Sequence, residues 1–336
     1  MGRSSLYGLL DPYWAQFWGE SVVKWLQCII CANSAPRPIA GGYLGEGAGW
    51  RWICWTLAIA SGVGTIGSFI LQEETYPPIL LSKRATKLIK DTGNTSLKAQ
   101  TDIDTNRTPS QIFGLAIIRP LRLLFLSPAV SVLSLYLGVV YGFLYLLFTT
   151  FPLVFQEQYG FDTGEIGLSY IGLGIGSIVG LGIAGSVSDK IHHKKALEGP
   201  VKPEYRIVPL IPAAFCIPAG LFWYGWSAHY KTHWIVPELG TAITGIGINV
   251  LMMCVSTYLI DANPRYEASA NAAATATRSL IGALVPLFGR SMYKAMGLGW
   301  GNSLLGFLTL AMAPLPWLFF KYGEKIRTSP RFQLKL

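Results

Sequence analysis

Charged residues are scarce in this chain of 336 residues. Asp, Glu, Lys and Arg make up 13% of it, whereas an ordinary soluble domain carries about 25%. Apolar residues make up 51%, which argues against a soluble enzyme and indicates long apolar segments. The net charge of +9 does not indicate a nucleic-acid partner, because the basic residues lie between apolar runs and not on one folded face.

Residues that bind metals or carry out catalysis are also few. The chain has five cysteines and four histidines. Cys28 and Cys31 form a single CxxC pair, a weak metal signal without a second pair. His192 and His193 adjoin lysines and fit a solvated basic loop better than a metal site. We find no zincin motif, P-loop or nucleophile elbow, so the sequence predicts no metal, no cofactor and no enzymatic activity.

Seven apolar segments are long enough to cross the roughly 30 Å of hydrocarbon in a bilayer. They are Trp52–Leu71, Ala129–Phe151, Ile166–Val187, Ile207–Ala228, Trp234–Ile260, Ser269–Phe288 and Trp300–Phe320. The sixth is the weakest, because it is rich in small polar residues. The sequence therefore predicts an all-α membrane protein with about seven transmembrane helices.

The stretches between these segments alternate in basic residues. Nineteen Lys and Arg fall on one predicted side of the membrane and three on the other. The connector 152–165 has none, whereas the connector 188–206 has five. Because cytosolic loops are enriched in Lys and Arg, the rich side is expected to be cytosolic. This orientation places the C-terminus inside.

Small residues recur along the segment Ile166–Val187. Gly172, Gly176 and Gly180 are spaced four residues apart and share one face of a helix. Such a face lets two helices approach closely in lipid. The sequence predicts a helix-packing seam, of a kind that often slides in transporters.

A few polar side chains fall at membrane depth, where each is costly unless paired or hydrated. Glu238 is a candidate proton or cation site, and Asn249 is a polar group at mid-depth. Asp189, Asp261 and Arg278 are assigned as structural or gating charges. Asp261 and Arg278 have two interpretations, the lining of a water-filled path or an ion pair at the inner interface. The ion pair is favoured because Asp261 ends its helix.

Aromatic side chains form a stripe on the segment Ala129–Phe151. Tyr141, Tyr145 and Phe148 are spaced i, i+4 and i+7 and share one helix face. Such stripes usually only pack. The two hydroxyl groups need polar partners at mid-membrane, so the wall of a substrate cavity is the alternative. The cavity candidates are thus these three residues with Glu238 and Asn249.

An ordered series of short motifs extends from about residue 36 to the C-terminus. It includes GWRW (49–52), LSLYLGVVYGFLYLLFTTFPLVF (133–155), PEYR (203–206), GLFWYGW (220–226), HWIVP (233–237), YLID (258–261) and YGEKIR (322–327). The series resembles the second part of a fungal major facilitator superfamily transporter. The most similar group is the twelve-span drug:proton antiporter family, which includes multidrug and polyamine exporters. The seven segments then correspond to family spans six to twelve.

This resemblance divides the chain into five parts. They are an unrelated N-terminal segment (1–33), the end of the N-terminal half (34–71), a cytosolic central linker (72–128), a C-terminal six-helix transporter half (129–320) and a cytosolic tail (321–336). Family spans one to four have no counterpart, nor does the span-four arginine associated with proton coupling. The chain is expected to be N-terminally incomplete, and to be inactive alone or dependent on a separate N-terminal half.

The resemblance implies export of small organic compounds, such as drugs, toxins or polyamines, by proton antiport. The plasma membrane is the expected location, with the vacuolar membrane as the alternative. The implied partners are substrate, proton and the lipid bilayer. Two other classes stay open: a seven-helix receptor, and a non-transporting partner or regulator derived from a transporter half. The receptor is disfavoured by the long linker and by the absence of an NPxxY motif near the last segment's end.

Overall fold

The computed structural model describes residues 36–71, 85–86, 88–92, 109–162, 164–198, 202–264 and 266–328. Within these ranges the regular elements are all helices, and no strand occurs. The predicted all-α fold is confirmed. The chain divides into two compact units, one of Ala48–Arg119 and one of Met1–Gly47 with Pro120–Leu336, and each is described separately.

The smaller unit contains α3 (Trp50–Leu71) and the first part of α5 (Pro109–Leu126). The bounds of α3 agree with the first predicted span to within two residues. The helix α5 occupies the end of the segment predicted as a linker, with Pro109 at its start and Pro120 inside it. The predicted N-terminal segment 1–33 lies outside the described residues.

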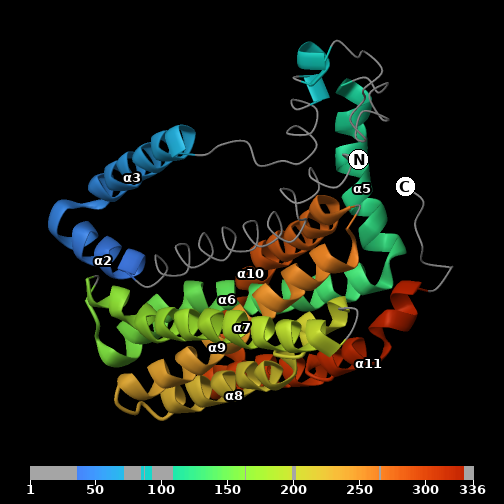
Figure 1. The fold of residues 1–336 in the computed structure, drawn as a ribbon. Coiled ribbons are helices and arrows are strands. Elements are labelled where there is room, and N and C mark those ends of the chain that lie inside the picture. The colour runs from blue at the N-terminus through green and yellow to red at the C-terminus, as the bar shows by residue number, and fades with distance from the viewer. Residues whose placement is uncertain are drawn as a thin grey trace. The chain divides into compact units, whose positions relative to one another are not determined.

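The larger unit is a bundle of long helices. They are α2 (Pro36–Ala48), α6 (Pro128–Tyr159), α7 (Ile171–Glu198), α8 (Leu210–His229), α9 (Ile235–Ala262), α10 (Glu267–Met312) and α11 (Leu315–Thr328), with the 3₁₀ turns η3 (Glu165–Tyr170) and η4 (Pro203–Ile207). Figure 1 shows α6, α7, α8 and α9 running side by side. Packing is most extensive between α6 and α10, between α7 and α9, and between α8 and both α9 and α10.

The local sequence explains where α6 begins and ends. Pro128 stands at its first turn, where the missing N–H costs no hydrogen bond. Gly160 ends it in the left-handed conformation (φ 70°), and its N–H donates to the carbonyl of Gln156. Glycine adopts this conformation without the steric cost of a Cβ.

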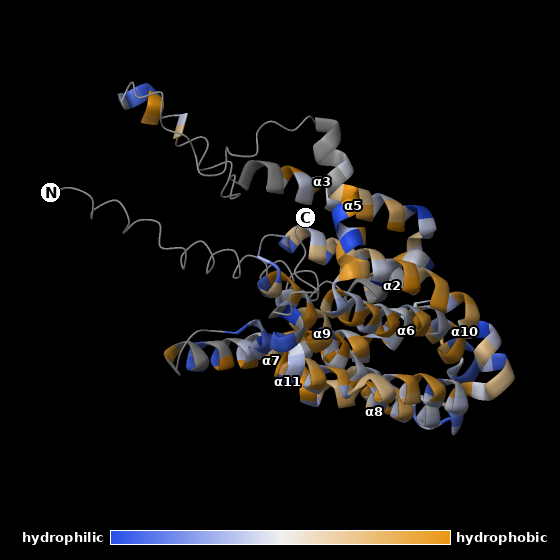
Figure 2. Ribbon diagram, turned by 90° about the vertical axis from the view of Figure 1, so that its right-hand side faces the viewer, coloured by the Kyte–Doolittle hydropathy of each residue, from blue (hydrophilic) through white to orange (hydrophobic). Residues whose placement is uncertain are grey.

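The surface of the bundle is largely apolar. Many large apolar side chains are exposed, including Ile175, Phe215, Leu280, Leu287 and Phe288. Figure 2 shows hydrophobic residues along the helices and hydrophilic residues gathered mainly near helix ends. A water-soluble monomer rarely exposes so extensive an apolar surface, so these side chains face lipid.

Five segments in the described part of the chain are long and apolar enough to cross a membrane: Pro128–Tyr159, Glu165–Ser188, Pro203–His229, Ile235–Ala262 and Glu267–Lys325. The first four agree with predicted spans. The fifth contains both Ser269–Phe288 and Trp300–Phe320. The expected loop between these two is wrong, because the helix continues to a sharp bend at Gly297 (φ 74°). Residues 289–296 contain no proline to end it sooner.

Candidate functional site

The predicted aromatic stripe lies on α6 and faces α10. The hydroxyl of Tyr141 donates to that of Tyr145 at 3.3 Å, and their ring centroids are 4.9 Å apart. Phe148 extends the stripe, 6.0 Å from the ring of Tyr145. Tyr145 is 40% exposed. The two hydroxyl groups thus satisfy each other in part and leave an accessible polar surface.

Arg278 of α10 joins this aromatic surface. Its guanidinium carbon lies 5.1 Å from the ring centre of Tyr141, within the range of a cation–π contact. Gly282, one turn further along α10, leaves room for the same ring, since an added Cβ would lie 3.1 Å from its Cδ1. Tyr141 and Arg278 are about 20 and 17 Å along their helices from the starts of α6 and α10, hence near the middle of a bilayer.

Glu238 lies on a different side of the bundle, between α9 and α7. It is buried, and its Oε2 accepts a hydrogen bond from the N–H of Gly172 at 2.7 Å. Its Oε1 has no hydrogen-bond partner among the described residues. Asn249 donates from Nδ2 to the carbonyl of Gly245 at 3.1 Å, within α9. The structure therefore brings Tyr141 and Tyr145 together with Arg278, but Glu238 faces another helix.

The glycine stripe of α7 lies against the backbone of α9. A Cβ added at Gly172, Gly176 or Gly180 would overlap backbone atoms of Glu238, Ala242 and Ile246, respectively. These three α9 residues are also about one turn apart. The two helices therefore approach more closely than any side chain would allow on this face.

Asp261, at the end of α9, forms an ion pair with a residue other than the predicted Arg278. Asp261 Oδ2 accepts from Arg206 Nε at 2.9 Å, and the Arg206 side chain is 4% exposed. Ser188 is a second partner of Arg206, at 3.5 Å. The expected ion pair between Asp261 and Arg278 is wrong, because Arg278 stacks on an aromatic ring deeper in the bundle.

Two further ion pairs lie at this same end, on η4 and α11. Glu204 is buried and accepts from Arg327 Nε at 3.4 Å. Lys202 pairs with Glu324 at 2.6 Å, and that hydrogen bond raises the pKa of the Lys202 amine. The side chain of Asp189 lies outside the part of the chain that the structure describes.

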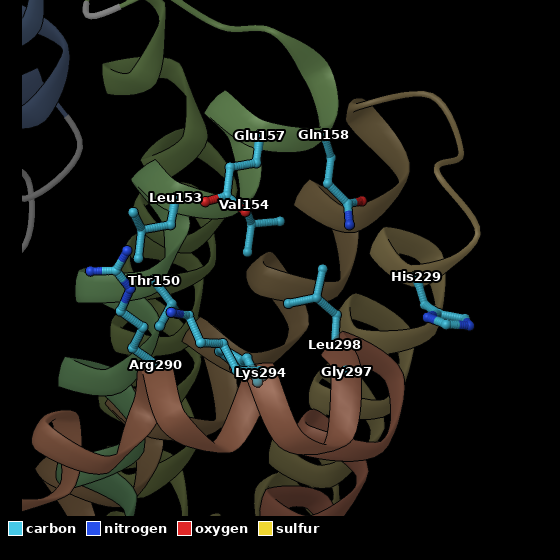
Figure 3. A pocket seen from close by; sticks show the side chains of 11 residues that line it. Thr150, Leu153, Val154, Glu157, Gln158, His229, Arg290, Lys294, Gly297 and Leu298 are labelled. Carbon is cyan, nitrogen blue, oxygen red and sulfur yellow. The ribbon is translucent and has the colours of Figure 1, made fainter.

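A pocket of about 380 Å³ opens at the opposite end of the bundle. We call it the end pocket. It lies between the last turns of α6, the end of α8 and the bend of α10 (Figure 3). Its lining includes Thr150, Val154, Glu157, Arg290, Lys294 and Leu298.

Sequence reasoning missed two features of these sites. The alternation of basic residues places Arg206 among the loop cations of the connector 188–206. It follows Glu204 in the PEYR motif, and two opposite charges so close to an apolar segment are a signal for a buried network. Arg290 and Lys294 fall between two predicted spans, and the sequence predicts no more for them than loop charges. Because the packing of α10 on α6 brings them to the pocket, which the bend at Gly297 also lines, their shared site depends on a tertiary geometry that spacing alone does not give.

Long apolar helices, a lipid-facing surface and polar groups at mid-depth define an integral membrane protein with many spans. Residues 37–286 match the Major Facilitator Superfamily, and the chain belongs to this family. It is 53% identical to "MFS-type transporter penM" of Penicillium rubens over 88% of this chain and 58% of that protein. It is 46% identical to "Efflux pump radE" of Floropilus chiversii, over 89% of this chain and 56% of that protein.

A third relative, "MFS transporter cpaT" of Aspergillus oryzae, is 46% identical over 88% of this chain and 60% of its own length. The chain thus spans little more than half the length of these relatives. No solved structure matches it. The family and the fungal relatives confirm the resemblance to a fungal major facilitator superfamily transporter.

Proposed function

We propose that the chain forms the C-terminal half of a transporter that exports small organic compounds, such as drugs, toxins or polyamines, by proton antiport. The observation that carries this proposal is the surface of Tyr141, Tyr145 and Arg278, polar and aromatic at the middle of an otherwise apolar bundle. Family folds bind substrate near the midplane between two halves. The name "Efflux pump radE" of one relative supports export.

The candidate residues take distinct roles in this proposal. Tyr141, Tyr145 and Phe148 form an aromatic wall against the substrate, and Asn249 adds a polar group. Glu238 carries the proton, because it is a buried carboxylate with one oxygen that has no partner among the described residues.

The remaining candidate residues act on helix packing, either by allowing helices to slide or by fixing them in place. The stripe of Gly172, Gly176 and Gly180 allows α7 to slide along α9, since at Gly176 and Gly180 the glycines meet backbone atoms of α9. At Gly172 the hydrogen bond to Glu238 also crosses this seam. Asp189, Asp261 and Arg278 act as structural or gating charges. For Asp261, its ion pair with Arg206 supports this role.

The proposed transporter needs a second, N-terminal half. In a lone half, the partly exposed Tyr145 and Arg278 would border lipid, where a charge without an ion-pair partner costs about 2.5–3.5 kcal/mol at mid-membrane. We expect the C-terminus to be cytosolic and the protein to lie in the plasma membrane, with the vacuolar membrane as the alternative. The connector 188–206 then shares the cytosolic side with the C-terminus.

Efflux from a transporter-depleted yeast tests the proposal. The full chain is expressed alone and together with the N-terminal half of a family transporter, and loss of a panel of fluorescent compounds is measured. We expect export only with both halves, reduced by Tyr145→Ala without loss of folded protein. No export of any compound, with both halves present in the membrane, would support a non-transporting partner or regulator instead.

A further inference from the structure

The end pocket has the size and position of a binding site that the proposed function does not use. Its volume of about 380 Å³ lies within the usual range for small-molecule sites, about 300–1,000 Å³. The walls come from three separate helices, α6, α8 and α10. The bend at Gly297 forms one side, and its positive φ of 74° is a conformation that favours glycine.

The charges of the pocket are arranged on opposite rims. Figure 3 shows Arg290 and Lys294 extending from α10, while Glu157 extends from α6. Arg290 and Lys294 are four residues apart, so they share one face of the helix. In the described part of the chain, none of these three residues takes part in an ion pair within 4.0 Å. With two cationic side chains and one carboxylate, these rims carry a net positive charge.

An apolar wall accompanies these charges. Leu153 and Val154 of α6 and Leu298 of α10 line the pocket beneath the rims. A guanidinium binds a carboxylate through two parallel hydrogen bonds, and an ammonium one turn away adds a second positive charge. The carboxylate of Glu157 can accept hydrogen bonds but cannot donate them, so it binds a hydroxyl or N–H group. The pocket thus offers an anion site, an apolar wall and one acceptor.

We propose that the end pocket binds an organic acid of small-molecule size. Its carboxylate lies between Arg290 and Lys294, its apolar body lies on Leu298 and Val154, and a hydroxyl or N–H group donates to Glu157. This site is distinct from the surface of Tyr141 and Arg278 at mid-membrane. It goes beyond the proposed function, because binding here does not require the chain to transport.

Equilibrium dialysis of the purified full chain in lipid nanodiscs tests the site. The probe is 6-hydroxy-2-naphthoate, which is fluorescent, and its methyl ester is the uncharged comparison. We expect the acid to bind at least about tenfold more tightly than the ester, as one charge-assisted hydrogen bond implies, and binding to weaken with salt. Equal binding of acid and ester would overturn the proposal. So would displacement of the acid by inorganic phosphate at equal concentration, which would indicate a phosphate or lipid headgroup site.

Two variants assign the contacts. Arg290→Gln with Lys294→Gln removes both charges from exposed positions and should weaken binding of the acid about tenfold or more. Lys194→Gln, at an exposed lysine of α7 outside the pocket, is the matched control and should change nothing. Unchanged binding in the double variant refutes the site. Equal helix content by circular dichroism confirms that each variant is folded.

Glu157→Gln gives an independent test, because it should strengthen the binding of one acid and weaken the preference for another. It should strengthen binding of 2-naphthoate, which has no donor, because a repelling carboxylate is removed. It should also reduce the preference for the hydroxylated acid over 2-naphthoate. A preference that Glu157→Gln leaves unchanged would contradict the role of Glu157. Because these measurements follow binding and not efflux, their failure is separate from a failure of the proposed transport.

Discussion

Replacing Gly176 by alanine tests the close packing of α7 on α9. A Cβ at this position would lie 2.7 Å from the carbonyl carbon and 2.8 Å from the Cα of Ala242, and would overlap the carbonyl oxygen. All three are backbone atoms, so no change of rotamer relieves the overlap. Gly182, on the same helix, is the matched control, because nothing lies within 4 Å of its added Cβ.

The magnitude follows from the two opposing effects of the new methyl group. Carbon atoms in contact lie about 3.5–4.0 Å apart, so α7 must move away from α9 by roughly 1 Å. Overpacking of this kind costs about 1–3 kcal/mol, and a rigid backbone neighbour places it near the upper limit. Alanine is favoured over glycine in a helix by about 1 kcal/mol. We expect Gly176→Ala to destabilise the chain by about 2 kcal/mol and Gly182→Ala to stabilise it by up to about 1 kcal/mol.

Unfolding of the purified chain in mixed micelles measures this difference. Increasing mole fractions of dodecyl sulfate unfold the protein, and loss of far-ultraviolet circular dichroism gives the free energy of unfolding for each variant. The two alanine variants should differ by about 3 kcal/mol. If Gly176→Ala is as stable as Gly182→Ala, α7 and α9 do not pack through their backbones, and the proposed sliding seam is refuted with them.

Other residues give further tests. Arg206→Gln should lower the free energy of unfolding by about 3 kcal/mol, because it leaves Asp261 without its ion-pair partner; micelle unfolding measures this, and a change below about 1 kcal/mol contradicts it. Glu238→Gln keeps an acceptor for the N–H of Gly172 and should preserve folding but abolish the pH dependence of efflux in the two-half assay; unaltered pH dependence excludes Glu238 as the proton carrier. Gly297→Ala should destabilise by about 1–2 kcal/mol, because its positive φ is strained for alanine; equal unfolding curves would show that the bend is not needed.

The helices that cross the membrane could be predicted from sequence, because length and apolarity alone define them in lipid. Four of the five candidate spans fall where the apolar runs predict. Length and apolarity could not show that the predicted loop between residues 289 and 299 is absent. Its polar residues Arg290 and Lys294 look like a connector, yet helix formation tolerates them at a membrane surface, and only the bend at Gly297 ends the helix.

The candidate site could be predicted in part. The spacing of Tyr141 and Tyr145 fixes their common face, and their contact follows from helix geometry. The partners of Asp261 and Arg278 could not be predicted, because they depend on which helices are neighbours and how deep each residue lies. Sequence alone shows that Asp261 and Arg278 have opposite charges on adjacent segments, but not how deep each one lies. In the structure the two residues lie at different levels of the bundle.

The two ends of the bundle hold their charges in different ways. Where α8 begins, Arg206 pairs with Asp261 and Glu204 with Arg327, so η4 is tied to both α9 and α11. Separating these elements would leave buried charges unpaired, which is strongly unfavourable. At the other end, the cations of the end pocket have no ion-pair partner in the described ranges, so the proposed acid would bind there without breaking an ion pair. Under the proposed transport, the first end would therefore resist opening within this half, while the second would accept a ligand at no cost in ion pairs.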